Sequence, residues 1–340
     1  MTNYVTLLSK HRSAIMGFAI IWIMIAHLKV SFDFIPLQAI KKIGYGGVDI
    51  FLFLSGFGLY FSCSKDNFKK RQYYITRFKR ILPEFWFVLV FVFIIRMDFT
   101  CESFYKLICQ ASTLGLWVWG KIPYTLWYIS CILFFYVIYP QYYSLFKKYG
   151  IIVPLLCVGG GILLMGSYAL FCFFFFDKQN VGGNAIFAYA RIPIFFIGSI
   201  FGWMAKNDVK IALTHTHKVV ALATVLLLFI ALIGIIRLYP SSFVLRVCSL
   251  NFIPFIIITP IFCMILAKGF ERVDIMDKFF AHIGCLTLEL YLCHSYIYIL
   301  YDYFFVNYGK YIAIIFVVLL SYIAAWVLHI LNKECLQRII

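Results

Sequence analysis

The chain has 340 residues, of which 64% are hydrophobic, 20% are aromatic and only 13% are charged. The interior of a soluble domain could not hold that much apolar surface, so the composition excludes a soluble protein and indicates a helical protein that crosses the membrane several times. The net charge of +16 does not require a nucleic-acid partner, because basic cytoplasmic loops that contact anionic membrane lipid account for it.

Ten apolar segments along the chain are each long enough to cross a bilayer as a helix. They run approximately over residues 12–30, 44–64, 80–97, 124–145, 151–173, 185–205, 219–238, 246–267, 281–304 and 311–330. The sequence therefore predicts an all-α integral membrane protein, a single domain over 1–340 formed by a bundle of about ten transmembrane helices. No small-residue cleavage site follows the first segment, so we expect it to be retained as a span.

The basic residues predict how the spans are oriented. The connection between the second and third spans, KDNFKKRQYYITRFKR, is strongly basic and should lie in the cytoplasm. This places both termini inside, in a multi-pass protein of the cytoplasmic (inner) membrane. If the apolar stretch 103–119 crossed the membrane, it would reverse the orientation of every later span. We therefore interpret it as an interfacial or re-entrant piece on the outer side.

Two ionisable residues lie in the first two spans, His27 near the end of one and Asp49 near the start of the next. A charged group at membrane depth costs roughly 2.5–3.5 kcal/mol, so such residues usually have a partner or a function. Both lie about 5–8 Å below the outer edge at 1.5 Å per residue, on helices expected to be antiparallel neighbours. The residues alone leave two readings open, a general-base dyad or a structural hydrogen bond.

Other polar residues suggest further parts of a site. Arg77 and Arg80 share one helix face, which suits the phosphates of a ligand, although the residues alone favour anchoring of the helix at the membrane surface. Glu289 and His294 lie in the ninth span, where His294 fits a structural hydrogen bond better than catalysis. Arg191 in the sixth span is expected to pair with Asp49 or Glu289, or to meet an anionic sugar.

Several common kinds of site are not indicated. The eleven cysteines show no CxxC or Cys/His spacing, so no metal site is expected. The glycines of the second span form no phosphate-binding loop, and no GxSxG elbow of a serine hydrolase is present.

Five segments resemble, in order, the motifs of membrane acyltransferase family 3. They are GFAIIWIMIAHLKV (17–30), GYGGVDIFLFLSGFGLYF (44–61), RFKRILPEFW (77–86), LWYISCILFFYVIYP (126–140) and TLELYLCHSYIY (287–298). The resemblance implies a ten-helix bundle that acylates sugar hydroxyls of surface polysaccharides with cytosolic acetyl-CoA. It makes His27 the essential histidine, Asp49 its acidic partner, and Arg77 and Arg80 contacts of the acyl-CoA donor.

Arg71 and Ser130 are added to the expected donor site, and Glu289, His294 and Arg191 to the expected acceptor site. The chain departs from the family pattern in two places. Met16 stands where many members have an arginine, although Arg12 lies one turn earlier and would have to reach the same region by snorkelling. The fourth span reads Ser130-Cys131-Ile132 where an acidic motif is common. The chain also has no room for the extracytoplasmic esterase-like domain that is often fused to this fold.

The sequence thus predicts a membrane-bound O-acetyltransferase whose partners are acyl-CoA, a surface polysaccharide or lipid-linked glycan, and membrane lipid. His27, oriented by Asp49, is expected to act as general base or as acyl relay, with acetyl-CoA as donor and no metal. A homo-oligomer is compatible with this interpretation. The alternative from another class is a non-enzymatic exporter or transporter of polysaccharide, because intramembrane ionisable groups also mark transport paths.

Overall fold

The computed structural model describes residues 3–97, 99–114, 116–117, 127–175, 185–209, 215–238 and 252–336. Throughout these ranges the regular secondary structure is helical, and they contain no strand. The described residues of every apolar segment predicted from the sequence are mostly helical, which confirms the all-α class for the described part of the chain.

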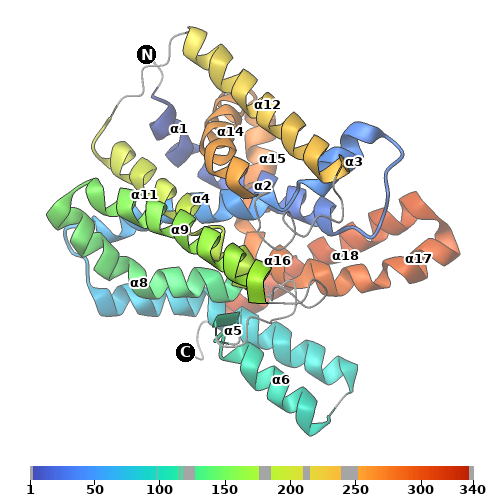
Figure 1. The fold of residues 1–340 in the computed structure, drawn as a ribbon. Coiled ribbons are helices and arrows are strands. Elements are labelled where there is room, and N and C mark those ends of the chain that lie inside the picture. The colour runs from blue at the N-terminus through green and yellow to red at the C-terminus, as the bar shows by residue number, and fades with distance from the viewer. Residues whose placement is uncertain are drawn as a thin grey trace.

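The helices of the first half are α1 (Tyr4–Lys10), α2 (Arg12–His27), α3 (Ile35–Lys42), α4 (Gly46–Cys63), α5 (Lys70–Arg96), α6 (Cys101–Ala111), α8 (Trp127–Tyr149) and α9 (Ile152–Phe175). Those of the second half are α10 (Ala185–Tyr189), α11 (Ile192–Lys206), α12 (His215–Leu238), α14 (Ile253–Arg272), α15 (Asp274–Cys285), α16 (Thr287–Ile297), α17 (Tyr301–Tyr308) and α18 (Lys310–Leu331). Figure 1 shows α2 and α4 in the middle of this arrangement.

Only some of these helices meet the requirements of a membrane crossing. Within the described ranges, five are long and apolar enough to cross, or up to seven if each of two bent pairs forms one span. The ten crossings and the orientation predicted from the sequence are therefore not confirmed. The helix α6 has 11 residues, about 16 Å at 1.5 Å per residue, so it is too short to cross a core of about 30 Å.

The centre of the bundle is α4, which is apolar, aromatic and glycine-rich and has nearly all of its residues buried. It packs against α11 at a contact that contains Gly56, Gly198 and Gly202. A Cβ atom at Gly56 would collide with the carbonyl oxygen of Phe195, and one at Gly198 with that of Phe53. The two backbones therefore approach as closely as glycine allows, which is a common way for helices to associate in membranes.

A second pair of glycines joins α2 to α15 in the same way. A Cβ atom at Gly17 would meet the carbonyl oxygen of Phe280, and one at Gly284 would meet that of Ser13. Since α2 also packs against α4, the first two long helices are neighbours as the sequence predicted. These contacts fix the positions of the side chains that α2 and α4 contribute to the site.

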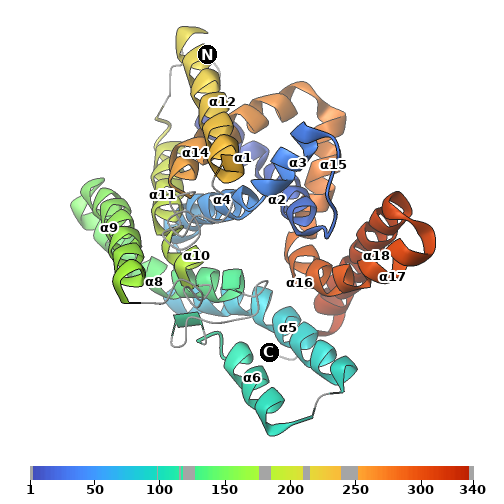
Figure 2. The ribbon, with the colours of Figure 1, turned by 45° about the vertical axis from the view of Figure 1, so that its right-hand side comes forward.

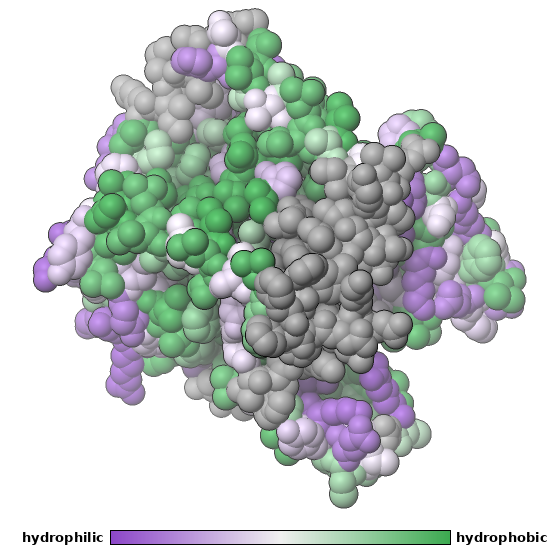
Figure 3. Space-filling model, in the orientation of Figure 1, coloured by the Kyte–Doolittle hydropathy of each residue, from purple (hydrophilic) through white to green (hydrophobic). Residues whose placement is uncertain are grey.

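The helix α16 follows a sharp bend, because α15 and the segment Thr287–Tyr308 meet at 72°. After the bend, α16 packs against α2, α5 and α18 (Figure 2). On the outside of the molecule, hydrophobic side chains gather over the part of the face where α9 and α11 lie, whereas hydrophilic side chains lie at the end formed by α6 (Figure 3). This distribution fits a bundle with a lipid-facing girdle.

Candidate functional site

A cavity of about 110 Å³ opens between α2, α4, α5, α8 and α16. Three arginines line it, Arg12 from α2 and Arg77 and Arg80 from α5, and we call it the arginine cavity. Ser62 of α4 and Thr287 at the start of α16 add hydroxyl groups to its wall. Arg77 and Arg80, predicted to share a helix face, thus open onto the same space.

The side chains of the arginine cavity are placed as in a binding site for an anion. Arg77 donates a hydrogen bond to Oγ of Ser62, and its guanidinium lies 5.6 Å from the ring centroid of Tyr73. The guanidinium of Arg12 lies against Gly58, where a Cβ atom would collide with it, and its buried Nε has no hydrogen-bond partner. Among the described residues, no carboxylate forms an ion pair with any of the three arginines. Guanidinium groups gathered in this way favour phosphate or carboxylate oxygens.

Met16 lines the same cavity as Arg12. The position that differs from the family pattern and the arginine one turn earlier therefore face one space. This placement supports the expectation that Arg12 reaches the region where many members of the family have an arginine in place of Met16.

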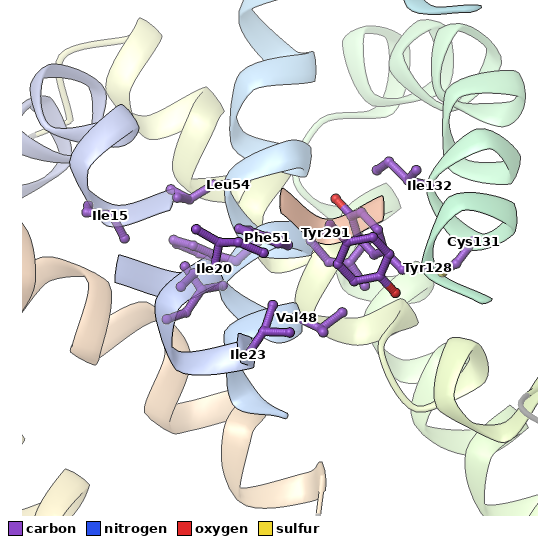
Figure 4. Close-up of a cluster of buried hydrophobic side chains, with 14 of the residues drawn as sticks. Ile15, Ile20, Ile23, Val48, Phe51, Leu54, Tyr128, Cys131, Ile132 and Tyr291 are labelled. Atoms are coloured by element: carbon purple, nitrogen blue, oxygen red, sulfur yellow. The ribbon is translucent and has the colours of Figure 1, made fainter. Parts of the chain in front are cut away.

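An aromatic cluster forms the deep end of the arginine cavity. Phe51 of α4, Tyr128 of α8 and Tyr291 of α16 all line it. The ring centroids of Tyr128 and Tyr291 are 5.1 Å apart, and those of Phe51 and Tyr128 are 5.8 Å apart (Figure 4). The ring of Tyr291 lies 5.9 Å from that of His294, one turn further along α16. The cavity floor is thus in contact with a buried histidine.

His294 forms a pair with His27, the last residue of α2. Nδ1 of His27 lies 2.9 Å from Nε2 of His294, and the two rings stack with centroids 5.1 Å apart. His294 is fully buried, whereas His27 is exposed. The accessible imidazole of His27 is therefore in contact with the buried imidazole of His294.

The hydrogen-bond partners assign the protons of this pair in its neutral state. Nδ1 of His294 lies 2.8 Å from the carbonyl oxygen of Leu290, which only accepts, so this nitrogen carries the hydrogen. Nε2 of His294 then has a lone pair, and Nδ1 of His27 must donate to it. The lone pair of His27 is consequently on Nε2. This is the tautomer that a general base needs, held by a second residue.

Asp49 does not contact His27 through any hydrogen bond or ion pair within the described part of the chain, so the expected dyad is not formed. The carboxylate Oδ2 of Asp49 lies 3.4 Å from Nη2 of Arg191, and both side chains are almost completely buried. Arg191 precedes α11, donates to the carbonyl oxygen of Phe187 at 3.0 Å, and lies 4.1 Å from the ring centroid of Phe252. Pairing with Asp49 was one of the options predicted for Arg191, and it is confirmed.

The remaining predicted residues are spread over the bundle. Glu289 lies 2.5 Å from Nδ1 of His329 of α18, beside a second buried acid, Glu84, which accepts a hydrogen bond from Asn332. Arg71 is exposed and lines none of the described cavities. Ser130 is buried and lines a separate, largely apolar cavity.

Sequence reasoning missed the pairing of His27 with His294, which joins residues 267 positions apart. It also missed the aromatic floor and the partners of Glu289. A signal for His294 was present, because the segment TLELYLCHSYIY places Tyr291 and His294 one helical turn apart.

Comparison with known proteins yields one match. The sequence model of a family described as an acyltransferase domain matches residues 15–330, which include both histidines and the arginines of α5. No curated protein and no solved structure matches the chain.

Proposed function

The chain belongs to membrane acyltransferase family 3, and from this membership we propose that it transfers an acetyl group from acetyl-CoA to a hydroxyl of a cell-surface polysaccharide or its lipid-linked precursor. One observation carries the proposal: α16 joins the arginine cavity, through Thr287 and Tyr291, to the histidine pair at His294. An anion site and a positioned base thus share one wall.

The arginine cavity supports a site for the donor. Coenzyme A carries several phosphate groups, whose oxygens bind the guanidinium forks of Arg12, Arg77 and Arg80. Arg12 and His27 lie at opposite ends of α2, about 22 Å apart at 1.5 Å per residue. The long pantetheine arm then lies along α16, past the rings of Tyr128 and Tyr291, toward His27.

His27 supplies the base in this proposal. Nε2 of His27 takes the proton of the acceptor hydroxyl while the oxygen attacks the thioester carbonyl carbon. The carbon–sulfur bond then breaks, and the coenzyme A thiolate receives the proton from the imidazolium. His294 acts as a positioning residue, because it accepts the hydrogen bond that fixes the tautomer of His27.

A variant of the mechanism uses the same residues. Nε2 of His27 attacks the thioester carbonyl carbon and the carbon–sulfur bond breaks, which gives an acetyl-imidazolium and the coenzyme A thiolate. The oxygen of the sugar hydroxyl then attacks the acetyl group, the bond to Nε2 breaks, and the hydroxyl proton passes to the thiolate. This relay suits a donor and an acceptor that reach the histidine from opposite ends of the bundle. Asp49 and Arg191 remain outside both schemes as a buried pair between α4 and α11.

The test is acetyl transfer by membranes that contain the protein. Wild-type membranes should move labelled acetyl from acetyl-CoA to the host polysaccharide, and His27→Ala membranes should lose about 10²-fold or more of this activity. The variant should still bind coenzyme A, because the arginine cavity is unchanged. Equal acetylation by His27→Ala would refute the catalytic role. Polysaccharide export without any acetylation would favour the transporter alternative.

Asp49→Asn distinguishes a structural role of Asp49 from a catalytic one in the same assay. We expect lower stability, because breaking a buried ion pair costs roughly 3–5 kcal/mol, but a normal rate per folded molecule. A folded Asp49→Asn protein with a much lower rate would show that Asp49 takes part in the reaction.

A further inference from the structure

A second cavity lies at the end of α5 away from the arginine cavity. It has a volume of about 130 Å³ and lies between α5, α6 and α16. Its wall includes two basic side chains, Arg96 and Lys106, and three neutral polar ones, Ser103, Gln110 and Tyr296. We call it the α6 cavity.

The α6 cavity carries a positive charge that the described ion pairs do not neutralise. Lys106 pairs with Glu102 at 2.6 Å, whereas Arg96 forms no ion pair with any described residue. Other cations at this end of the bundle have carboxylate partners, since Lys29 pairs with Asp302 and Lys310 with Asp33. The guanidinium of Arg96 is therefore available for an anionic oxygen group, which it can bind in a bidentate manner.

The helix α16 connects this cavity to the histidine pair. Along α16, Thr287 and Tyr291 line the arginine cavity, His294 contacts His27, and Tyr296 lines the α6 cavity. Tyr296 follows His294 by only two residues, about 3 Å along the axis. The α6 cavity therefore lies at nearly the same level of the bundle as the histidine pair but on the other face of α16, because side chains two residues apart on a helix point in nearly opposite directions.

The surroundings of the α6 cavity are those of a membrane interface. Exposed apolar side chains flank it on both helices, among them Ile94 and Ile95 of α5 and Phe104 and Ile108 of α6. Hydrophilic side chains gather at the same end of the molecule (Figure 3). A short helix with one apolar and one polar face is typical of the headgroup region, where the phosphates of a lipid lie.

We propose that the α6 cavity binds the phosphate or diphosphate of a lipid-linked glycan, whose sugars then extend around α16 to the exposed His27 at the same level of the bundle. This inference rests on the proposed acetyl transfer and names its acceptor class. Arg96 and Lys106 bind the phosphate oxygens, Ser103 and Gln110 donate hydrogen bonds, and the lipid tail lies along the exposed apolar side chains of α5 and α6.

The first test measures binding to the purified full-length protein in detergent micelles. A long-chain isoprenoid diphosphate should bind the wild type, and Arg96→Gln should weaken binding about tenfold or more, because charge-assisted hydrogen bonds are lost. Arg96→Lys should retain part of the affinity. Lys310→Gln, which removes a paired cation at the same end, is the matched control and should bind as the wild type does.

Two results of this test would overturn the proposal. One is equal affinity of wild type and Arg96→Gln, provided that both bind coenzyme A equally and are therefore folded. The other is equally tight, Arg96-dependent binding of phosphatidylglycerol, which would make the cavity a site for any anionic lipid headgroup. Competition by inorganic diphosphate is expected, because the phosphates are the recognised part.

A kinetic arm separates this inference from the proposed function. With a lipid-linked glycan as acceptor, Arg96→Gln should raise the KM for the acceptor and leave the KM for acetyl-CoA unchanged. If the wild type transfers acetyl but Arg96→Gln has the same acceptor KM, the site is wrong and the function stands. If the wild type binds the isoprenoid diphosphate through Arg96 but transfers no acetyl, the function fails and the site stands.

Discussion

His294 is a fully buried residue that, in the proposed mechanism, fixes the tautomer of its exposed neighbour His27. Its Nδ1 is committed to the carbonyl oxygen of Leu290, so its Nε2 accepts from His27. A neutral imidazole is usually oriented by a carboxylate or a carbonyl group. Here a second imidazole has that role, through the lone pair on its Nε2.

His294→Phe should lower kcat about 10²–10⁴-fold with the KM for acetyl-CoA unchanged, because Nδ1 of His27 loses its acceptor while the ring volume is kept. His294→Gln should recover part of the rate, since its amide oxygen can accept the same hydrogen bond. Steady-state kinetics on the purified variants measure both effects. A wild-type kcat in His294→Phe would show that the pair is structural.

At this scale the sequence singled out His27 and Asp49 as costly groups at membrane depth, but the contact expected between them is not formed. Position along a helix fixes depth in the membrane, and both residues were placed by depth. It does not fix which face of the bundle a side chain reaches once ten or more helices are packed. Asp49 faces α11 and Arg191, while His27 faces α16, a helix that only the tertiary fold brings close.

The helix pairs of the core depend on glycines that allow backbones to touch. In the contact between α4 and α11, Gly198 lies against the backbone of Phe53. By contrast, Gly160 of α9 has open space where a Cβ atom would be. Alanine substitutions at the two positions therefore form a matched pair that measures how much the close backbone contact contributes to stability.

Gly198→Ala should destabilise the protein by about 1–3 kcal/mol or more, because the methyl group forces α4 and α11 apart. Gly160→Ala should be neutral or stabilising by about 0.5–1 kcal/mol, since alanine has the higher helix propensity. Thermal unfolding in detergent measures both changes. Equal unfolding temperatures for the two variants would contradict the contact between α4 and α11.

The helices were predicted best, because a long apolar segment in a membrane has few alternatives to forming a helix. The bends were not foreseen, and α1 meets α2 at 73° next to His11. His11 lies 2.7 Å from carboxylate oxygens of both Glu271 and Asp277, so α14 and α15 hold the chain at this bend. Such contacts join distant segments, and a hydropathy pattern carries no information on them.

Across the whole molecule, the arginine cavity and the histidine pair lie toward opposite ends of the bundle. The helix α5 has 27 residues, about 40 Å, so its two ends can reach opposite surfaces of a bilayer. Length and composition support five to seven crossings in the described ranges, which is fewer than the ten predicted from the sequence.

Labelling of single-cysteine variants with a membrane-impermeant maleimide tests the orientation. Native Cys101, exposed at the start of α6, should react in intact cells. Asn67→Cys, in the exposed connection between α4 and α5, should react only after the cells are opened. The reverse pattern would place the arginine cavity outside, away from cytosolic acetyl-CoA, and would contradict the proposed donor.

If the arginine cavity holds the phosphates of the donor, as we propose, it has a consequence for how the protein senses its surroundings. Acetyl-CoA and free coenzyme A carry the same phosphates, so three arginines that hold phosphates cannot tell substrate from product. The two must then compete for one site with similar affinity, and turnover follows the ratio of acetylated to free coenzyme A rather than the amount of either. The rate of surface modification would thereby report the acetyl supply of the cell.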